Sequence, residues 1–223
     1  MATFTRIFSH LTRSLINQPP KMAWRSHGTS NATLIAALQR NHLLTSPLIS
    51  TAMLLIDRAD FCPANPYQDS PQRLPQSPTA TISAPHMHAA ALETLLPFMN
   101  PGARVLDVGS GSGYLTCCFA ALVQPRGEVV GVEHGEGLRR LGEGNARKAV
   151  GSREWVESGQ VRFVVGDGRR GWRDGKGGWD VIVSFWFCLT GLFVVDLTWL
   201  MCCAYCSMLE LQRPGSSRNL WIS

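Results

Sequence analysis

A glycine-rich run is the part of the chain best suited to holding a small molecule. Apolar residues from Val105 lead into Gly109, Gly111 and Gly113, and a helical pattern follows, so we expect a buried strand that turns tightly into a helix. Glycines let the backbone approach a ligand closely, and the free amides of a helix start favour an anionic group. The spacing is G-x-G-x-G, and Tyr114 occupies the last glycine position of the dinucleotide pattern G-x-G-x-x-G. The run therefore predicts a ligand loop of another kind, or a turn with a structural role only.

Acidic residues at the ends of three apolar runs add to this pattern. Asp107 belongs to the first run, Glu133 ends a second run over 128–132, and Asp167 follows a third run over 161–165. Ligands of parallel sheets bind beyond the carboxyl ends of the strands, where Glu133 can accept both ribose hydroxyls of an adenosine cofactor. Asp167 can accept a hydrogen bond from the adenine amino group. One acidic strand end is commonplace because acids favour helix starts, but three in register predict a cofactor site.

The elements that must position these residues form an α/β fold. From the first apolar run onward, strand and helix patterns alternate as far as a fourth strand that begins at Asp180. This alternation predicts a doubly wound, mostly parallel sheet with crossover helices. Earlier in the chain, helices are expected after Ser30, Ser46 and Ser83, because serine is a favoured N-cap residue. Residues 60–80 contain five prolines and are expected to form an extended loop.

The composition fits one globular domain. The chain has 223 residues, of which 45% are hydrophobic, enough to bury a single core. The net charge is +5, but residues 1–21 carry +3 of it and no basic stripe is visible elsewhere, so no nucleic-acid partner is expected. Seven cysteines show no disulfide framework, which favours a reduced intracellular compartment. The lone Cys203-x-x-Cys206 pair lacks a second pair or a nearby histidine, so we expect no metal.

The first 21 residues differ in composition from the rest of the chain. They are rich in Thr, Ser, Arg and apolar residues, a composition typical of a mitochondrial transit peptide. The alternative is a disordered extension ahead of an internal start at Met22. We therefore expect a cytoplasmic location, with a mitochondrial one through residues 1–21 as the alternative.

Several motifs make the chain resemble the protein-L-isoaspartate (D-aspartate) O-methyltransferase family over about residues 22–183. The run 80–89, which reads ATISAPHMHA, is specific to this family, whereas the glycine loop is shared by many class I methyltransferases. The other motifs follow the family's order: Met22–Ser26, Asp57-Arg58, NPYQDSPQ over 65–72, DVGSGSG over 107–113 and VGDGR over 165–169.

The resemblance implies a class I methyltransferase fold that uses S-adenosyl-L-methionine. Its substrates would be L-isoaspartyl residues in damaged proteins and peptides. Apart from the resemblance, we expect the chain to be a monomer if it folds. Ser83 falls at the family's active-site serine. The family's cofactor-contacting positions fall on Ala80, Thr81, Ile82, Ser83, His88, Asp107, Gly109, Ser110, Gly111, Gly113, Glu133, Asp167 and Gly168.

The chemistry that these residues can supply agrees with that reading. An isoaspartyl carboxylate is already ionised at pH 7, because a carboxylic acid titrates near pH 4. It needs alignment with the methyl donor more than a general base, and the Ser83 hydroxyl can orient it by one hydrogen bond. The alternative is that Ser83 serves only as the N-cap of the following helix. We interpret His88 as a donor in the cofactor pocket, and His86 has no assigned role.

Two departures from the family pattern affect these expectations. The segment 73–79 is longer than the family's loop and contains two prolines and no glycine, so peptide recognition could be altered. We divide the chain into an N-terminal extension over 1–21, a methyltransferase domain over 22–183 and an atypical hydrophobic tail over 184–223. The second departure is this tail, which does not follow the family pattern. The sheet would then be truncated after its fourth strand, and we expect poor solubility and little activity.

Other functions remain open at this point. The run 181–209 carries one charge, Asp196, and is long enough to span a bilayer, although a membrane span is not the favoured interpretation. The chain could also be an inactive cofactor-binding fragment that acts as an interaction or regulatory protein. A third possibility is a class I methyltransferase for another substrate.

Overall fold

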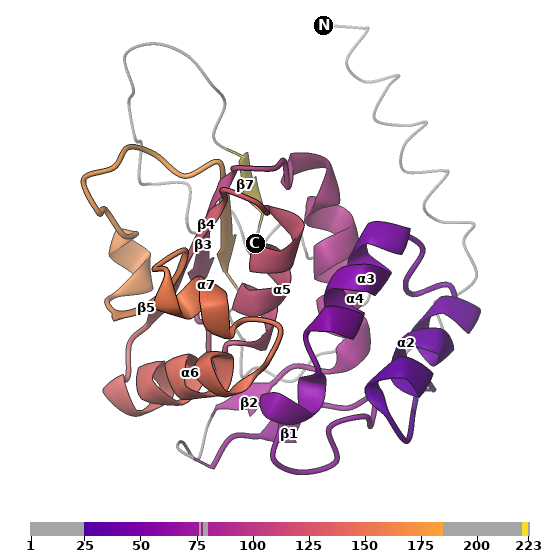
Figure 1. Ribbon diagram of the computed structural model, residues 1–223. Helices are drawn as coiled ribbons and strands as arrows, with labels where there is room; N and C mark the ends of the chain where they lie inside the picture. The colour runs from indigo at the N-terminus through magenta and orange to yellow at the C-terminus, as the bar shows by residue number, and fades with distance from the viewer. Residues whose placement is uncertain (1–24, 76, 78–79, 185–219, 223) are drawn as a thin grey trace, which may run out of the picture.

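A parallel β-sheet forms the centre of the protein (Figure 1). The computed structural model describes residues 25–75, 77, 80–184 and 220–222. The sheet has the strand order β5-β4-β3-β6-β7, and all neighbours are parallel. The strands are β3 (Arg104–Val108), β4 (Glu128–Glu133), β5 (Val161–Val165), β6 (Val181–Ser184) and β7 (Leu220–Ile222).

The order in which successive strands are added to the sheet reverses at β3. The chain runs from β3 outward through β4 to β5 and then returns to place β6 on the other side of β3. Ligands of open α/β sheets bind at such a switch point, outside the carboxyl ends of the strands. The expected doubly wound strand order is therefore present. The expected truncation after the fourth strand is wrong, because β7 adds a short fifth strand beside β6.

Helices cover one face of this sheet. The crossover helices are α5 (Tyr114–Leu122), α6 (Glu136–Lys148) and α7 (Arg153–Glu157), and they pack on β4 and β5. The earlier helices α2 (Asn31–Arg40), α3 (Pro47–Leu55) and α4 (Pro85–Leu95) extend this layer through contacts of α3 with α5. On the opposite face, Trp179 packs against Leu106, Val130 and Ile182.

The starts of α2 and α3 follow directly from their sequences. Ser30 and Thr33 form a capping box in which each side chain accepts a backbone hydrogen bond of the other residue. Ser46 caps α3, and Pro47 stands at its first position, where a missing amide proton costs nothing. Both predicted helix starts are confirmed.

The start of α4 differs from the expected one. Its N-cap is Ala84, which has no side-chain hydrogen bond to offer. The carboxylate of Asp69, which is remote in sequence, accepts a hydrogen bond from the His86 amide at 3.0 Å. The interpretation of Ser83 as the N-cap is therefore wrong, because the extended backbone at Ala84 places Ser83 one residue before the cap.

Residues 60–80 form mostly a loop, as expected, but a small hairpin closes it. After the short helix η1 (Arg58–Asp60), strand β1 (Gln72–Arg73) pairs antiparallel with β2 (Thr81–Ile82). The Leu74 amide also donates to the carbonyl of Ala80 at 2.9 Å. The hairpin delivers the family motif to the edge of the sheet, where the glycine loop lies (Figure 1).

Charged side chains tie the amino ends of the strands together. The carboxylate of Asp174, of which 5% is exposed, accepts hydrogen bonds from Arg104 at 2.7 Å and from Arg162 at 2.6 Å. Glu128 lies beside the same arginines and accepts from Lys176 at 2.9 Å. This cluster fixes the segment before β6 at the edge of the sheet opposite to the glycine loop.

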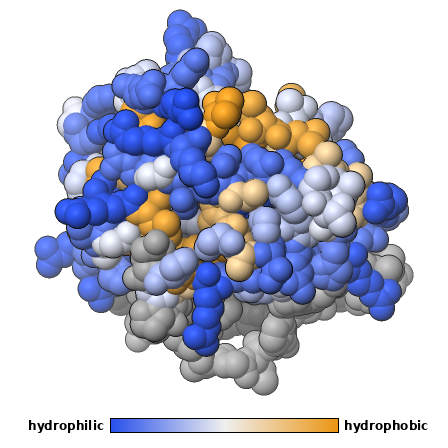
Figure 2. Space-filling model, turned by 60° about the horizontal axis from the view of Figure 1, so that its bottom comes forward, coloured by the Kyte–Doolittle hydropathy of each residue, from blue (hydrophilic) through white to orange (hydrophobic). Residues whose placement is uncertain are grey.

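The surface is mainly hydrophilic with separate hydrophobic areas, as Figure 2 shows for one face. Large apolar side chains exposed on α3 are Leu48, Leu54 and Leu55. Apolar exposure of this extent is ordinary for folded proteins.

Some expectations concern residues that the structure does not describe. No helix within the described ranges is long and apolar enough to cross a membrane. The possible span over 181–209 lies outside the described residues beyond Ser184, as do the extension over 1–21 and the Cys203-x-x-Cys206 pair. Among the described residues, no group of three His, Cys, Asp or Glu could hold a metal ion.

Candidate active site

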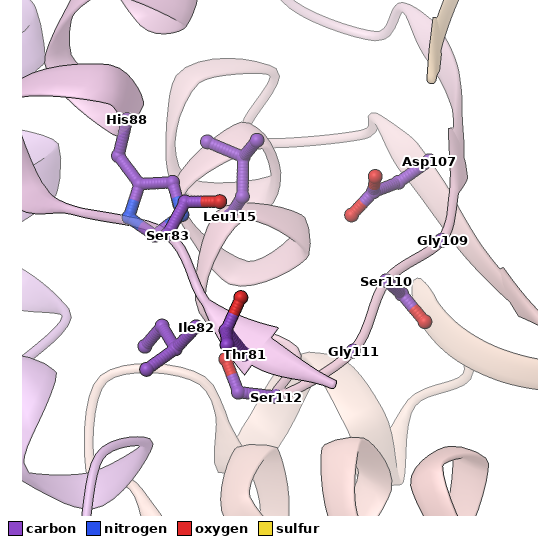
Figure 3. Close-up of a pocket in the computed structure, with 10 residues that line it drawn as sticks. All are labelled: Thr81, Ile82, Ser83, His88, Asp107, Gly109, Ser110, Gly111, Ser112 and Leu115. Atoms are coloured by element: carbon purple, nitrogen blue, oxygen red, sulfur yellow. The ribbon is translucent and has the colours of Figure 1, made fainter. Parts of the chain in front are cut away.

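A pocket opens at the carboxyl end of β3, between the glycine loop and the family motif (Figure 3). Its volume is about 340 Å³, including the part open to solvent. It is lined by Thr81, Ile82, Ser83, His88, Asp107, Gly109, Ser110, Gly111, Ser112 and Leu115. The structure thus brings together most of the predicted site residues, and it adds Ser112 and Leu115. It does not place Ala80, Gly113, Glu133, Asp167 and Gly168 among the lining residues.

The glycine loop has a backbone that favours glycine at each of its three glycine positions. Gly109, Gly111 and Gly113 have φ angles of 87°, 51° and 84°, in the left-handed region. Gly113 also serves packing, because a Cβ atom there would lie 2.9 Å from the carbonyl oxygen of Gly142 in α6. Gly113 therefore lets α6 approach the loop, whereas Gly109 and Gly111 face the pocket.

Asp107 is a buried carboxylate on the pocket wall. Only 2% of the residue is exposed, and its Oδ2 accepts a hydrogen bond from Thr116 Oγ1 at 2.5 Å. Burial raises the pKa of Asp107 to about 6, helped by the nearby negative charge of Glu133. Part of this carboxyl group's population therefore holds a proton near pH 6.

Glu133 supports the glycine loop from the end of β4. Its Oε2 accepts a hydrogen bond from the Gly111 amide at 3.1 Å, and its Oε1 accepts from the His134 amide at 2.9 Å. The acids are staggered rather than in register, because Asp107 pairs with Gly131 and Glu133 pairs with Val165. The expected aligned row is therefore wrong.

Asp167 is bonded to its own neighbour. It caps the short helix η3 (Gly168–Arg170), and its two carboxylate oxygens accept from Nε and Nη2 of Arg169, each at 2.9 Å. The hydrogen bonds from Arg169 lower the pKa of Asp167. Gly168 touches β3, because a Cβ atom there would lie 2.1 Å from Val108 Cγ1. Sequence reasoning missed the competing partner Arg169, although its spacing of two residues from Asp167 was a usable signal.

Ser83 and His88 stand on the other wall, opposite Asp107 in the view of Figure 3. Behind them lies Arg58, which is 0% exposed. Its Nη2 donates to the carbonyl oxygen of Ser83 at 2.7 Å, and its Nη1 lies 3.1 Å from His88 Nδ1. The Asp57-Arg58 motif does not reveal a role for Arg58 in the sequence, since nothing local marks an arginine as buried.

The contact with Arg58 fixes the state of His88. A guanidinium group can only donate, so His88 Nδ1 must accept, and the ring proton of the neutral side chain lies on Nε2. Burial, together with the charge of Arg58, holds the pKa of His88 well below its usual range. His86, left without a role by the sequence, binds Asp69 through Nδ1 at 2.7 Å.

The fold and the pocket define the protein as a member of the class I S-adenosylmethionine-dependent methyltransferases. A model of the protein-L-isoaspartate(D-aspartate) O-methyltransferase family matches residues 29–184. The chain belongs to this family, so the resemblance predicted from its motifs is confirmed, as is the α/β fold class.

Known relatives agree with this assignment. A protein-L-isoaspartate O-methyltransferase of Caenorhabditis elegans is 49% identical over 153 residues, which cover 69% of this chain and 66% of the relative. One from Triticum aestivum is 43% identical over 146 residues, covering 65% of this chain and 62% of the relative. The chain thus spans slightly less than two thirds of the length of these relatives.

Solved structures show the same similarity. A protein-L-isoaspartate O-methyltransferase from Plasmodium falciparum, in complex with S-adenosyl-L-homocysteine, superposes with a TM-score of 0.64 at 29% identity. The match covers 70% of this chain and 73% of that one. A second structure with the same enzyme name has a TM-score of 0.56 at 26% identity, covering 69% of this chain and 47% of that one.

Proposed function

We propose that this chain transfers a methyl group from S-adenosyl-L-methionine to the carboxylate of L-isoaspartyl residues in damaged proteins and peptides. The observation that carries the proposal is the pocket in which Ser83 and His88, from the family's specific motif, stand opposite Asp107 and the glycine loop. The names of the relatives and the S-adenosyl-L-homocysteine complex of the Plasmodium protein support it.

The residues present fit this cofactor. S-adenosyl-L-methionine, when bound, supplies a methyl group on a positively charged sulfonium. Two buried carboxylates, Asp107 and Glu133, give this edge of the sheet a negative potential and hydrogen-bond acceptors. We propose that Glu133 exchanges its hydrogen bond with the Gly111 amide for ribose hydroxyls, as strand-end carboxylates of adenosine sites do.

Other residues would complete the cofactor site. We propose that the strand-end residue Asp167 accepts from the adenine amino group, which requires Arg169 to release or share it. This exchange is inexpensive, since the two side chains are 38% and 74% exposed and such ion pairs contribute little. The remaining proposed contacts come from the hairpin and the segment after it, the glycine loop, and the starts of α4 and η3: Ala80, Thr81, Ile82, Ser83, His88, Gly109, Ser110, Gly111, Gly113 and Gly168.

The substrate needs positioning rather than proton transfer. Its carboxylate is ionised at neutral pH and can attack a methyl group directly. Ser83 has no hydrogen bond from its hydroxyl to another described residue, and Asp69, not Ser83, caps the following helix α4. The hydroxyl is thus available to donate to the carboxylate. The neutral His88 offers a second donor, Nε2–H, on the same wall.

The test is a methylation assay with two peptides that differ only at one linkage, isoaspartyl or aspartyl. The 223-residue chain is assayed with methyl-labelled S-adenosyl-L-methionine, beside a chimera in which residues 184–223 come from the Caenorhabditis relative. We expect base-labile label on the isoaspartyl peptide only, with more turnover by the chimera. Equal labelling of both peptides, or none by either protein, would contradict the proposal.

A further inference from the structure

A buried positive charge lies directly behind the pocket. Arg58 is 0% exposed, yet no carboxylate in the described ranges forms an ion pair with it. Asp69, whose negative charge is the smallest of the influences on Arg58, binds His86 at 2.7 Å instead. The Nε atom of Arg58 has no hydrogen-bond partner among the described residues. A buried charge is costly unless it is paired, so this arrangement calls for an anion that the folded chain does not itself supply.

The neutral contacts of Arg58 direct its charge toward the pocket. Its guanidinium lies 5.4 Å from the ring centroid of Tyr114, which interacts with the cation through its π-face. Its other partners are the Ser83 carbonyl and His88 Nδ1, both belonging to residues that line the pocket. None of these three neutral partners cancels the charge. The wall around Ser83 is therefore positive, while the opposite wall carries Asp107.

We propose that Arg58 is the positioning residue that draws the substrate carboxylate to Ser83, by supplying its counter-charge through the pocket wall and by holding the Ser83 backbone and the His88 ring. This inference rests on the proposed function, because it assigns a charge partner to the same substrate. Arg58 does not touch the substrate, since it is fully buried and does not line the pocket. The two walls divide the reactants by charge, with the cationic donor near Asp107 and the anionic acceptor near Ser83.

The experiment compares the affinity of two peptides for the protein saturated with S-adenosyl-L-homocysteine, by isothermal titration calorimetry. One is an isoaspartyl peptide, and the other carries a carboxamide in place of the isoaspartyl carboxylate. We expect the wild type to prefer the carboxylate roughly tenfold or more, a difference of about 1.4 kcal/mol. Arg58→Met, which keeps much of the side-chain volume, should reduce the preference to about threefold or less. Arg58→Lys, which keeps the charge, should retain the larger part of it.

Arg40→Met is the matched control, because Arg40 is an exposed arginine at the end of α2, away from the pocket lining. We expect it to behave like the wild type. A merely structural role for Arg58 would weaken both peptides equally and leave their ratio unchanged. An unchanged ratio in Arg58→Met would therefore overturn the inference.

The salt dependence of peptide binding to the wild type tests the role of Arg58 even if Arg58→Met does not fold. A buried charge is little screened by salt, so the preference for the carboxylate should persist at high salt concentration. Loss of the preference for the carboxylate with added salt would assign that preference to surface charges. It would overturn this inference and leave the proposed function standing. A wild type that binds the isoaspartyl peptide no better than its aspartyl twin would overturn the proposed function, and this inference with it.

Discussion

Replacing Asp107 with asparagine should stabilise the fold and weaken cofactor binding at the same time. The carboxyl group is buried, and its pKa lies at about 6 rather than the ordinary 3.8. The folded protein therefore resists ionisation of this group, whereas the unfolded chain ionises freely. An asparagine has the same shape, and its oxygen can still accept the hydrogen bond from Thr116.

The size of the effect follows from the two pKa values. Below the unfolded pKa of 3.8 both states of the protein hold the proton, so the substitution gains little. As the pH rises from 3.8 to the folded pKa of about 6, the unfolded chain ionises before the folded one, so the wild type loses stability that the variant keeps. The variant should gain ~0.5 kcal/mol at pH 4 and ~3 kcal/mol at pH 8 in its free energy of unfolding.

The assay is urea unfolding of both proteins at pH 4, 6 and 8, followed by circular dichroism. Titration with S-adenosyl-L-methionine at pH 8 should show weaker binding to Asp107→Asn, since the negative charge is lost. A stabilisation of equal size at all three pH values would refute the reasoning, because it would not come from ionisation. A variant less stable than the wild type at pH 8 would refute it too.

Four further substitutions test the site and the fold. Gly111→Val should abolish cofactor binding with an unchanged circular dichroism spectrum, because a β-branched residue is strained at a φ of 51°. Glu133→Ala should weaken binding of S-adenosyl-L-homocysteine by ~1–3 kcal/mol in calorimetry, through lost charge-assisted hydrogen bonds. Ser83→Ala should lower turnover far more than cofactor affinity, and its melting temperature should stay within a degree or two of the wild type, since Ser83 does not cap α4. Asp174→Asn should cost roughly 1–3 kcal/mol in urea unfolding and leave cofactor affinity unchanged, because it removes the carboxylate charge that bridges Arg104 and Arg162 at the far edge of the sheet.

The sequence predicted those features that depend on neighbours along the chain. The helix starts at Ser30 and Ser46 were readable because an N-cap bonds to an amide three residues away. The strands were readable because a buried parallel strand is a short apolar run. The glycine loop was readable because its turns require positive φ angles.

The features that the sequence did not predict depend on partners far apart in the chain. Asp69 caps α4 across 17 residues, and Arg58 reaches His88 across 30, so no local pattern announces either contact. The stagger of Asp107 and Glu133 follows from strand register, which a single sequence does not specify for a parallel sheet. The family motifs pointed to residues that line one pocket, but the partners of their side chains came only from the three-dimensional arrangement.

A crystal structure of the protein with S-adenosyl-L-homocysteine and an isoaspartyl peptide would test the proposed site most directly. We expect the cofactor product beside the glycine loop, with its ribose hydroxyls on Glu133 and its sulfur facing the substrate carboxylate. That carboxylate should accept a hydrogen bond from the Ser83 hydroxyl. A cofactor product bound away from residues 107–113, or a carboxylate that makes no contact with Ser83, would contradict the assignment.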